Sequence, residues 1–310
     1  MRRPVLRGLQ IAVALGLLAL LWRVADGAAA LRHLAGASLP WLAVALAALT
    51  AQTVLSALRW RLTAGQLGIT LDPRTALREY YLSQIVNQAL PGGVLGDAGR
   101  AMRARAHAGL LASGQAVVFE RLAGQVALFV LFGAAVAGTL AVPGGFDWPD
   151  ALLMPVAAFL ACGLCLGPLL WRIGPRLPGR AGRALSGFGA AFLRAVAARE
   201  VRGRQAAMSL GTALCNIAGF ACCAAAIGAP LPPATALVLV PLVLFTMLIP
   251  VTVSGWGLRE GAAAALLPLA GATAAQGLAA SVAFGLVFLL AALPGLLAVG
   301  PATRPGAVGP

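Results

Sequence analysis

The sequence has 310 residues, of which 60% are hydrophobic and 10% are charged, and its formal net charge is +14. This balance excludes a soluble domain and predicts an integral membrane protein. The positive charge is not expected to bind nucleic acid, because the arginines lie mostly between apolar spans and no basic patch carries aromatic side chains. It instead predicts the orientation of the protein and contact with anionic lipid headgroups.

The first part of the chain contains two predicted spans and a polar helix. Residues 9–24 form a short span, for which a cleaved signal peptide is the alternative; we favour a retained span because everything downstream is also apolar. The second span, 39–58, ends at Arg59-Trp60-Arg61, which is typical of an interfacial anchor. Segment 74–89 has helical propensity but is too polar to face lipid.

Four further spans complete a predicted set of six, at 115–142, 151–171, 206–228 and 275–299. Segment 172–204 carries eight Arg and one Glu, and we expect it to be a cytoplasmic loop. Segment 234–249 is apolar but has only 16 residues, so it barely crosses a membrane. The arginine bias predicts a multi-pass protein of the bacterial cytoplasmic (inner) membrane with both termini in the cytoplasm.

Two stretches of the chain share a skeleton of helix-breaking residues and a charge. They run from Pro91 to Arg100 and from Pro250 to Arg259, and in each Gly follows Pro by five residues and Arg by nine. The two lie 159 residues apart, about half of the chain. Such broken segments, repeated in each half of a membrane protein, favour a binding site over packing. The alternative is chance similarity in a sequence rich in Ala and Leu.

The predicted fold class follows from these elements. We expect an all-α integral membrane protein with one transmembrane domain, 1–310, built from six full spans and two broken or re-entrant segments. The first re-entrant segment would enter from the cytoplasm and the second from outside. The approximate halves, 1–142 and 151–299, would then form an inverted repeat.

The glycine-rich turns predict a phosphate clamp. They are expected to leave backbone N–H groups free, each ahead of a short helix whose N-terminus carries partial positive charge. Arg100 and Arg259 lie in the first turns of these helices and would add a guanidinium each. The alternative for the first turn is that Asp97 caps the helix and Arg100 reaches cytoplasmic headgroups.

Glu120 and Arg121 are adjacent and point about 100° apart on a helix, so each needs another partner. We expect Glu120 to face Arg100 or Arg259 across the cavity; the alternative is an interfacial pair at the end of a span. Glu79 and Tyr80 are further candidates to line the cavity, although an interfacial helix explains them equally well. The predicted substrate-binding residues are Asn87, Gly92, Gly93, Gly96, Asp97, Arg100, Glu120, Arg121, Gly255, Trp256, Gly257, Arg259 and Glu260.

Several of these motifs, in this order, resemble the transmembrane flippase-like region of lysylphosphatidylglycerol synthases and its stand-alone relatives. They are Arg59-Trp60, Asn87, Leu90-Pro91-Gly92-Gly93-x-x-Gly96-Asp97-x-x-Arg100, Glu120-Arg121-Leu122-x-Gly124, Ile249-Pro250, Gly255-Trp256-Gly257-Leu258-Arg259-Glu260-Gly261 and Leu293-Pro294-Gly295. Leu95 and Ser254 depart from the pattern, since Gly is usual at both places. The resemblance implies lipid translocation between leaflets. The aminoacyl-transferase domain of the fused relatives is not present here, so synthesis of aminoacyl lipids is not expected.

Two functional hypotheses follow, neither of them enzymatic. The first is a flippase or transporter of an anionic or modified lipid, with membrane lipids as its partners. The second is a non-transporting scaffold for a lipid-modifying enzyme of a hopanoid or glycolipid pathway, docked through the basic segment 172–204. An intramembrane enzyme that uses Asp97 and Glu120 is a third reading. The cysteines, among them the Cys162-x-x-Cys165 pair, lie in apolar spans without nearby His or acidic residues, so we expect no metal and no cofactor.

Overall fold

The computed structural model describes residues 12, 15–16, 19–89, 94–142, 146–249 and 255–297. These residues form helices and no strand. Five helices are long and apolar enough to cross a membrane, at Leu39–Gly65, Ala108–Ala141, Asp150–Arg176, Arg202–Ala226 and Ala274–Leu297. The predicted all-α membrane class is therefore confirmed. Seven of the sixteen residues of the first predicted span, 9–24, lie outside the described residues, as do the turns at 90–93 and 250–254, so the predicted number of spans stays a prediction.

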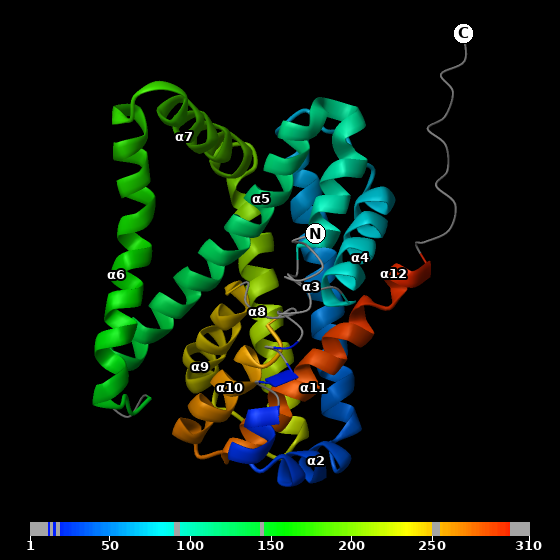
Figure 1. Cartoon of the computed structure of the whole chain (residues 1–310), viewed down its shortest axis with the longest axis vertical. Helices are drawn as coiled ribbons and strands as arrows, with labels where there is room; N and C mark the ends of the chain where they lie inside the picture. Colours follow the sequence, from blue (N-terminus) through cyan, green and yellow to red (C-terminus); the bar gives the residue numbers. More distant parts are fainter. Residues whose placement is uncertain are drawn as a thin grey trace.

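Figure 1 shows the helices in their order along the chain. Two of them were not predicted, at Gly27–Ala35 and, within the predicted loop 172–204, at Gly179–Phe192. They are α2 (Gly27–Ala35), α3 (Leu39–Gly65), α4 (Pro73–Ala89), α5 (Leu95–Ala141), α6 (Asp150–Ile173), α7 (Gly179–Phe192), α8 (Arg202–Ala226), α9 (Pro233–Phe245), α10 (Leu258–Leu266), α11 (Ala274–Ala292) and α12 (Pro294–Leu297). The 3-10 turns η3 (Thr246–Leu248) and η4 (Leu267–Ala270) extend α9 and α10.

The antiparallel pair of α3 and α8 forms the most extensive helix contact of the bundle. Near one end of the pair Gln205 Nε2 donates to Thr63 Oγ1 at 2.7 Å, and near the other the Ser38 N–H donates to the Ala226 carbonyl at 2.8 Å. Between them a Cβ on Gly219 would lie 2.9 Å from Leu49. A glycine at this point lets the two helices approach closely, as is usual between membrane helices.

Helix α5 consists of two segments that meet at a kink. Ala108 has φ −147° and Gly109 has φ 80°, neither of which is helical. Glycine adopts positive φ without the clash that a Cβ would cause, which explains the position of the kink. The first segment is the short arginine-bearing helix predicted after Gly96, and the second is the span Ala108–Ala141.

The polar helix α4 begins where its sequence provides a cap. Thr75 donates its N–H to Asp72 Oδ1 and its hydroxyl to Asp72 Oδ2, both at 2.9 Å, and Pro73 takes the first helical position. These hydrogen bonds lower the pKa of the Asp72 carboxyl. The predicted helix is thus confirmed, and its buried Ser83 and Gln84 lie on a face of α4 that packs against α3 and α5.

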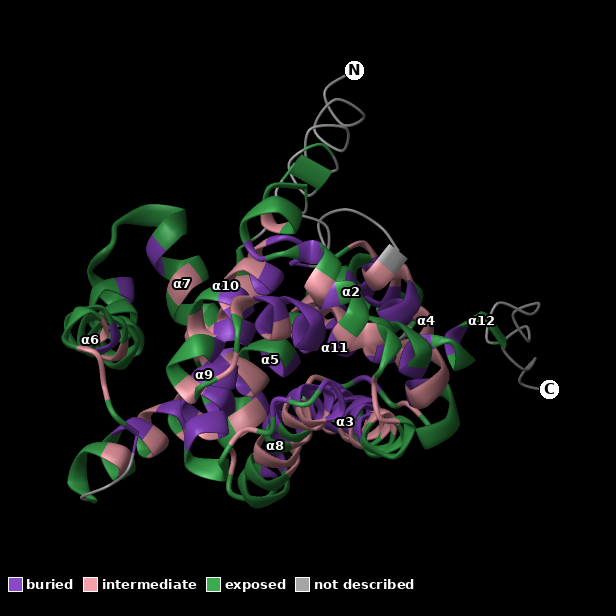
Figure 2. Cartoon of the chain, turned by 90° about the horizontal axis from the view of Figure 1, so that it is seen from below, coloured by how far each residue is buried: buried purple, intermediate pink, exposed green. Residues whose placement is uncertain are grey.

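Helices α6 and α7 form an arm beside the bundle. Figure 2 shows α6 apart from the other helices, and Val156 is its one buried residue. An apolar helix exposed around most of its surface is suited to contact lipid. The chain returns through α7, whose Phe188 and Phe192 rings pack edge-on against Phe119 of α5, with centroids 4.9 and 5.4 Å apart.

The close crossing of α10 and α11 predicts a stability effect. A Cβ on Gly277 would lie 2.3 Å from the Ala263 carbonyl oxygen, so Gly277→Ala must push the helices apart. We expect a loss of about 1–3 kcal/mol, measured as a lower melting temperature of the purified protein in detergent. Gly138→Ala is the matched control, since nothing lies within 4 Å of its Cβ, and it is expected to be neutral or stabilising. Equal melting temperatures for the two variants would contradict the close crossing.

Candidate functional site

A cavity of about 250 Å³ lies in the middle of the bundle, among α3, α4, α5, α8, α9, η3 and α11. One wall of the cavity is polar and comes from α3, α4 and α5, and α8 adds two polar side chains to it. The residues of this polar wall are Gln52, Ser56, Arg59, Tyr80, Ser83, Gln84, Asn87, Gln88, Asp97, Glu120, Arg121, Gln125, Thr212 and Asn216. The other wall is mostly apolar and includes Leu244, Met247, Leu248, Phe284 and Phe288. The cavity is thus amphipathic, although apolar helices surround it.

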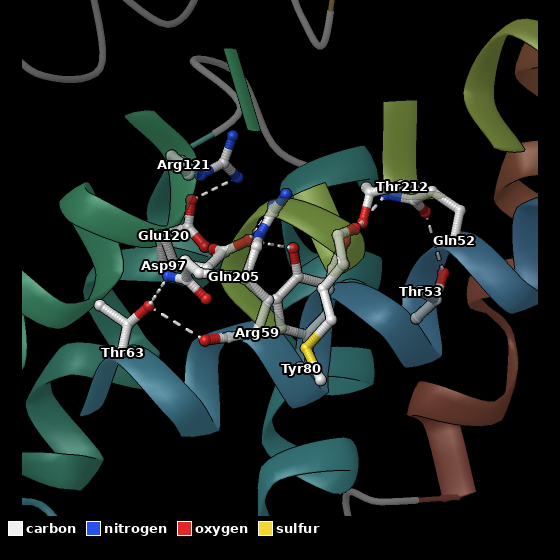
Figure 3. A network of polar contacts seen from close by, with 12 residues as sticks. Gln52, Thr53, Arg59, Thr63, Tyr80, Asp97, Glu120, Arg121, Gln205 and Thr212 are labelled. Carbon is white, nitrogen blue, oxygen red and sulfur yellow. Dashed lines mark hydrogen bonds and ion pairs between the residues drawn. The ribbon is translucent and has the colours of Figure 1, made fainter. Parts of the chain in front are cut away.

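Two polar stripes on the central helices build much of this cavity. Their residues are Gln52, Ser56, Arg59 and Thr63 on α3, and Gln205, Ser209, Thr212 and Asn216 on α8. Within each stripe the spacing is four, three and four residues, which keeps all four side chains on one face of a helix. Since α3 and α8 pack against each other, the two stripes meet inside the bundle rather than at its surface (Figure 3).

Five charged side chains form a continuous chain of ion pairs along the polar wall (Figure 3). Arg59 Nη2 lies 2.5 Å from Glu120 Oε1, and Arg100 Nη2 lies 3.3 Å from Glu120 Oε2. Arg100 Nη2 is also 3.0 Å from Asp97 Oδ1, and Arg121 pairs with Asp97 Oδ2. Three arginines thus share two carboxylates, which leaves a formal charge of +1.

Most of this chain is removed from solvent. Glu120 is 0% exposed, Arg100 1% and Arg59 3%, whereas Arg121 is half-exposed. The Arg100 guanidinium lies 4.5 Å from the centre of the Trp60 ring and 4.6 Å from that of Tyr80, and these cation–π contacts add to the hydrogen bonds of its Nη2. The four buried members, Arg59, Arg100, Asp97 and Glu120, balance to zero. The excess charge of +1 therefore lies with Arg121, which is half-exposed and lines the cavity. In apolar surroundings such a charge is costly unless a counter-ion is at hand.

Some buried polar atoms of the cavity have no hydrogen-bond partner. They are Nε and Nη1 of Arg59, Nε2 of Gln84 and Oε1 of Gln125. Buried donors and acceptors are normally satisfied, so such atoms at the wall of a cavity indicate a place for a ligand. The Arg59 guanidinium fits there because Gly124 has no side chain; a Cβ would lie 2.9 Å from Arg59 Nη2.

A second charged cluster lies between α10 and α11 and is closed on itself. Arg259 donates to Glu260 Oε1 from Nη2 at 2.6 Å and to Ser281 Oγ from Nε at 2.9 Å. The Gly257 N–H donates to Glu260 Oε2 at 2.6 Å. The prediction of a free amide at Gly257 is therefore wrong, because the carboxylate three residues later occupies it. The Trp256 and Phe284 rings flank the Arg259 guanidinium at 5.2 and 5.4 Å.

The structure places the predicted site residues in three groups. Asn87, Asp97, Glu120 and Arg121 line the cavity, and Arg100 stands behind it against Glu120. Gly96 donates its N–H to Asn87 Oδ1 at 2.7 Å, so Asn87 holds the start of α5. Gly255, Trp256, Gly257, Arg259 and Glu260 are outside the lining of the cavity, while Gly92 and Gly93 lie outside the described residues.

Two sequence expectations about the charges have clear outcomes. Of the two partners expected for Glu120, Arg100 is the one that it contacts. The interfacial anchor at Arg59-Trp60 is wrong, because both side chains are buried: the carboxylate of Glu120 and the cavity draw Arg59 inward.

Within the described part of the chain, no group of three or more His, Cys, Asp or Glu is arranged to hold a metal ion.

Glu120 is expected to be essential for stability. In Glu120→Gln two buried guanidinium groups lose their shared carboxylate, which should cost about 3 kcal/mol or more. Glu79→Gln is the control: it breaks the partly exposed pair with Arg103 and should cost at most about 1 kcal/mol. Thermal melting in detergent measures both changes. A melting temperature of Glu120→Gln equal to that of the control would show that the buried pairs do not carry stability.

The comparison with known proteins places the chain in a family. No curated protein and no solved structure matches the sequence. The family model for the lysylphosphatidylglycerol synthase TM region matches residues 8–295, which is most of the chain. The predicted resemblance is confirmed, and the motifs behind it include six residues that line the central cavity. The protein belongs to the lysylphosphatidylglycerol synthase transmembrane-region family.

Proposed function

We propose that the protein moves an anionic lipid between the two leaflets of the bacterial cytoplasmic membrane and holds its headgroup in the central cavity. One observation carries the proposal: a cavity inside an apolar bundle bears a formal charge of +1 from three arginines and two carboxylates. A single negative charge on a ligand would balance it. Family membership supports a lipid-related role in the membrane.

The two walls of the cavity fit an amphiphile. A headgroup would contact the polar side chains of α3, α4 and α5, while the start of the acyl chains would contact Leu248, Phe284 and Phe288 on the opposite side. The volume of about 250 Å³ equals roughly eight waters, which is room for a headgroup but not for a whole lipid. The acyl chains would therefore remain in the surrounding bilayer.

Arg59 is the residue best placed to bind the phosphate. Its Nη2 is held by Glu120, while its Nε and Nη1 have no partner. A guanidinium fixed at one nitrogen keeps its other donors oriented, and guanidinium groups pair well with phosphate oxygens. No catalytic step is part of this proposal.

The repeated order of elements supports alternating access. Helix α3, α4 and the two segments of α5 are followed in the second half by α8, α9, α10 and α11 in the same order. Figure 1 has α4 toward one end of the bundle and α9 and α10 toward the other. We propose that the halves form an inverted repeat that rocks around the central cavity, with both termini in the cytoplasm.

A scaffold that docks a lipid-modifying enzyme is the second candidate function. The observation in its favour is that all eight arginines of segment 172–204 are exposed, while α7 packs its aromatic residues inward. Such a surface suits an acidic protein partner. It suits the anionic headgroups of the cytoplasmic leaflet equally well, which is the role that the transport proposal gives it.

Leaflet exchange of fluorescent phosphatidylglycerol in proteoliposomes tests the proposal. Wild-type protein should catalyse exchange, and Arg59→Gln should slow it about tenfold or more, because a hydrogen bond to a charged group contributes about 1.5–3 kcal/mol. Arg105→Gln, an exposed arginine of α5 outside the cavity lining, is the matched control and should exchange at the wild-type rate. Melting temperatures must show that each variant is folded.

Charge reversal on α7 separates the two candidate functions. Arg180→Glu with Arg183→Glu should leave exchange by the purified protein unchanged under the transport proposal. Two results together would overturn transport and support the scaffold. The first is that folded wild-type protein exchanges no lipid from a broad panel. The second is that reversal of these two charges abolishes the function of the protein in cells.

A further inference from the structure

The carboxylates of the central cavity are all engaged by arginine. Each of the four oxygens of Asp97 and Glu120 has a guanidinium partner. Glu120 Oε1 also accepts from the Tyr80 hydroxyl, and Asp97 Oδ1 from Ser83. Among the described residues, no other acidic side chain lines the cavity. An ammonium group in this cavity would therefore find no available carboxylate and would meet a net positive charge.

The atoms without partners define what a ligand should supply. Arg59 offers donors at Nε and Nη1, which call for an anionic oxygen. Gln84 is 7% exposed and offers a donor at Nε2, whereas Gln125 offers an acceptor at Oε1. The Thr53 hydroxyl lies 3.0 Å from Gln84 Oε1 and holds the amide at the wall of the cavity. A ligand hydroxyl can accept from Gln84 and donate to Gln125, which neither an ammonium nor a phosphate oxygen can do.

The remaining polar lining is neutral and rich in amides. Besides Gln84 and Gln125 it contains Gln52, Ser56, Ser83, Asn87, Gln88, Thr212 and Asn216. Amides and hydroxyls both donate and accept, so they match several hydroxyl groups without adding charge. The lining is thus complementary to a polyol.

We infer that the cavity binds a phosphate ester that carries hydroxyl groups and no amine, such as a glycerol or sugar phosphate headgroup. That the ligand is a lipid rests on the proposed function. That the cavity binds a hydroxyl-bearing phosphate ester is inferred from the lining residues alone. An aminoacylated headgroup does not fit, because its ammonium would face three arginines whose carboxylates are already occupied.

Equilibrium binding to the purified full-length chain in detergent tests this assignment independently of transport. The probes are phosphatidylglycerol, phosphatidylethanolamine, phosphatidic acid and lysylphosphatidylglycerol with identical acyl chains, and soluble glycerol 3-phosphate. Phosphatidylglycerol should bind at least about tenfold more tightly than phosphatidylethanolamine or lysylphosphatidylglycerol, and more tightly than phosphatidic acid, which lacks the hydroxyls. Glycerol 3-phosphate that binds as tightly as phosphatidylglycerol would identify a soluble ester as the ligand; much weaker binding would identify the lipid.

Two substitutions at Gln125 connect the selectivity to the cavity. Gln125→Glu brings the formal charge of the cluster to zero, so it should lower phosphatidylglycerol binding about tenfold and raise that of lysylphosphatidylglycerol. Gln66→Glu adds the same charge at an exposed position at the end of α3 and should change neither. Gln125→Met removes the acceptor without adding charge and should bring phosphatidylglycerol and phosphatidic acid to similar affinities.

The outcomes separate the headgroup assignment from the transport proposal. Wild-type protein that binds phosphatidylethanolamine or lysylphosphatidylglycerol as tightly as phosphatidylglycerol would overturn the assignment, as would unchanged selectivity in folded Gln125→Glu. Selective binding without leaflet exchange would keep the assignment and overturn transport. Leaflet exchange of all headgroups at equal rates would keep the transport proposal and overturn the headgroup assignment.

Discussion

The buried chain of ion pairs around Glu120 is the constraint on which the rest of the bundle depends. A guanidinium inside an apolar bundle needs a carboxylate or a comparable partner close by, because lipid offers none. Glu120 provides that partner to Arg59 on α3 and to Arg100 on the first segment of α5 at the same time. Glycines make room for this arrangement: Gly124 leaves the space into which the Arg59 guanidinium fits, and a Cβ on Gly96 would lie 2.0 Å from the Ser83 carbonyl oxygen. The close approach at Gly96 brings α5 against α4 and places Asp97 within reach of Ser83.

The succession of helices could be predicted from the sequence because it depends on local signals. Long apolar runs predicted the described spans, and the low hydropathy of 74–89 predicted a helix away from lipid. The burial of Arg59 could not be predicted in this way, because an arginine at the end of an apolar run has the same local pattern whether it faces headgroups or Glu120. A polar residue at every third or fourth position of α3 and α8 was the signal that separates the two cases.

The two arginine motifs look equivalent in sequence but differ in the residue directly after the arginine. Arg259 precedes Glu260, whose carboxylate satisfies both the guanidinium and the Gly257 amide. Arg100 precedes an alanine, so its carboxylates come from Asp97 in its own helix and from Glu120 twenty residues later in the chain. The charged groups of the second cluster satisfy one another, so the cluster can link α10 firmly to α11. The first remains open toward the cavity, where Arg59 has donors without a partner and Arg121 carries the excess charge.

This asymmetry bears on how the proposed inverted repeat would hold its ligand. A ligand balanced between two equal charged motifs would be held from both halves, and any rocking motion would have to break one set of contacts. Here the charged contacts come from α3 and α5, while the second half contributes α8 hydroxyl and amide groups and the apolar side chains of α9, η3 and α11. Under the proposed transport, the apolar part of the second half can move along the ligand without the loss of directional bonds, and only the hydrogen bonds to α8 would have to exchange. One half is thereby suited to bind the headgroup and the other to open and close its path.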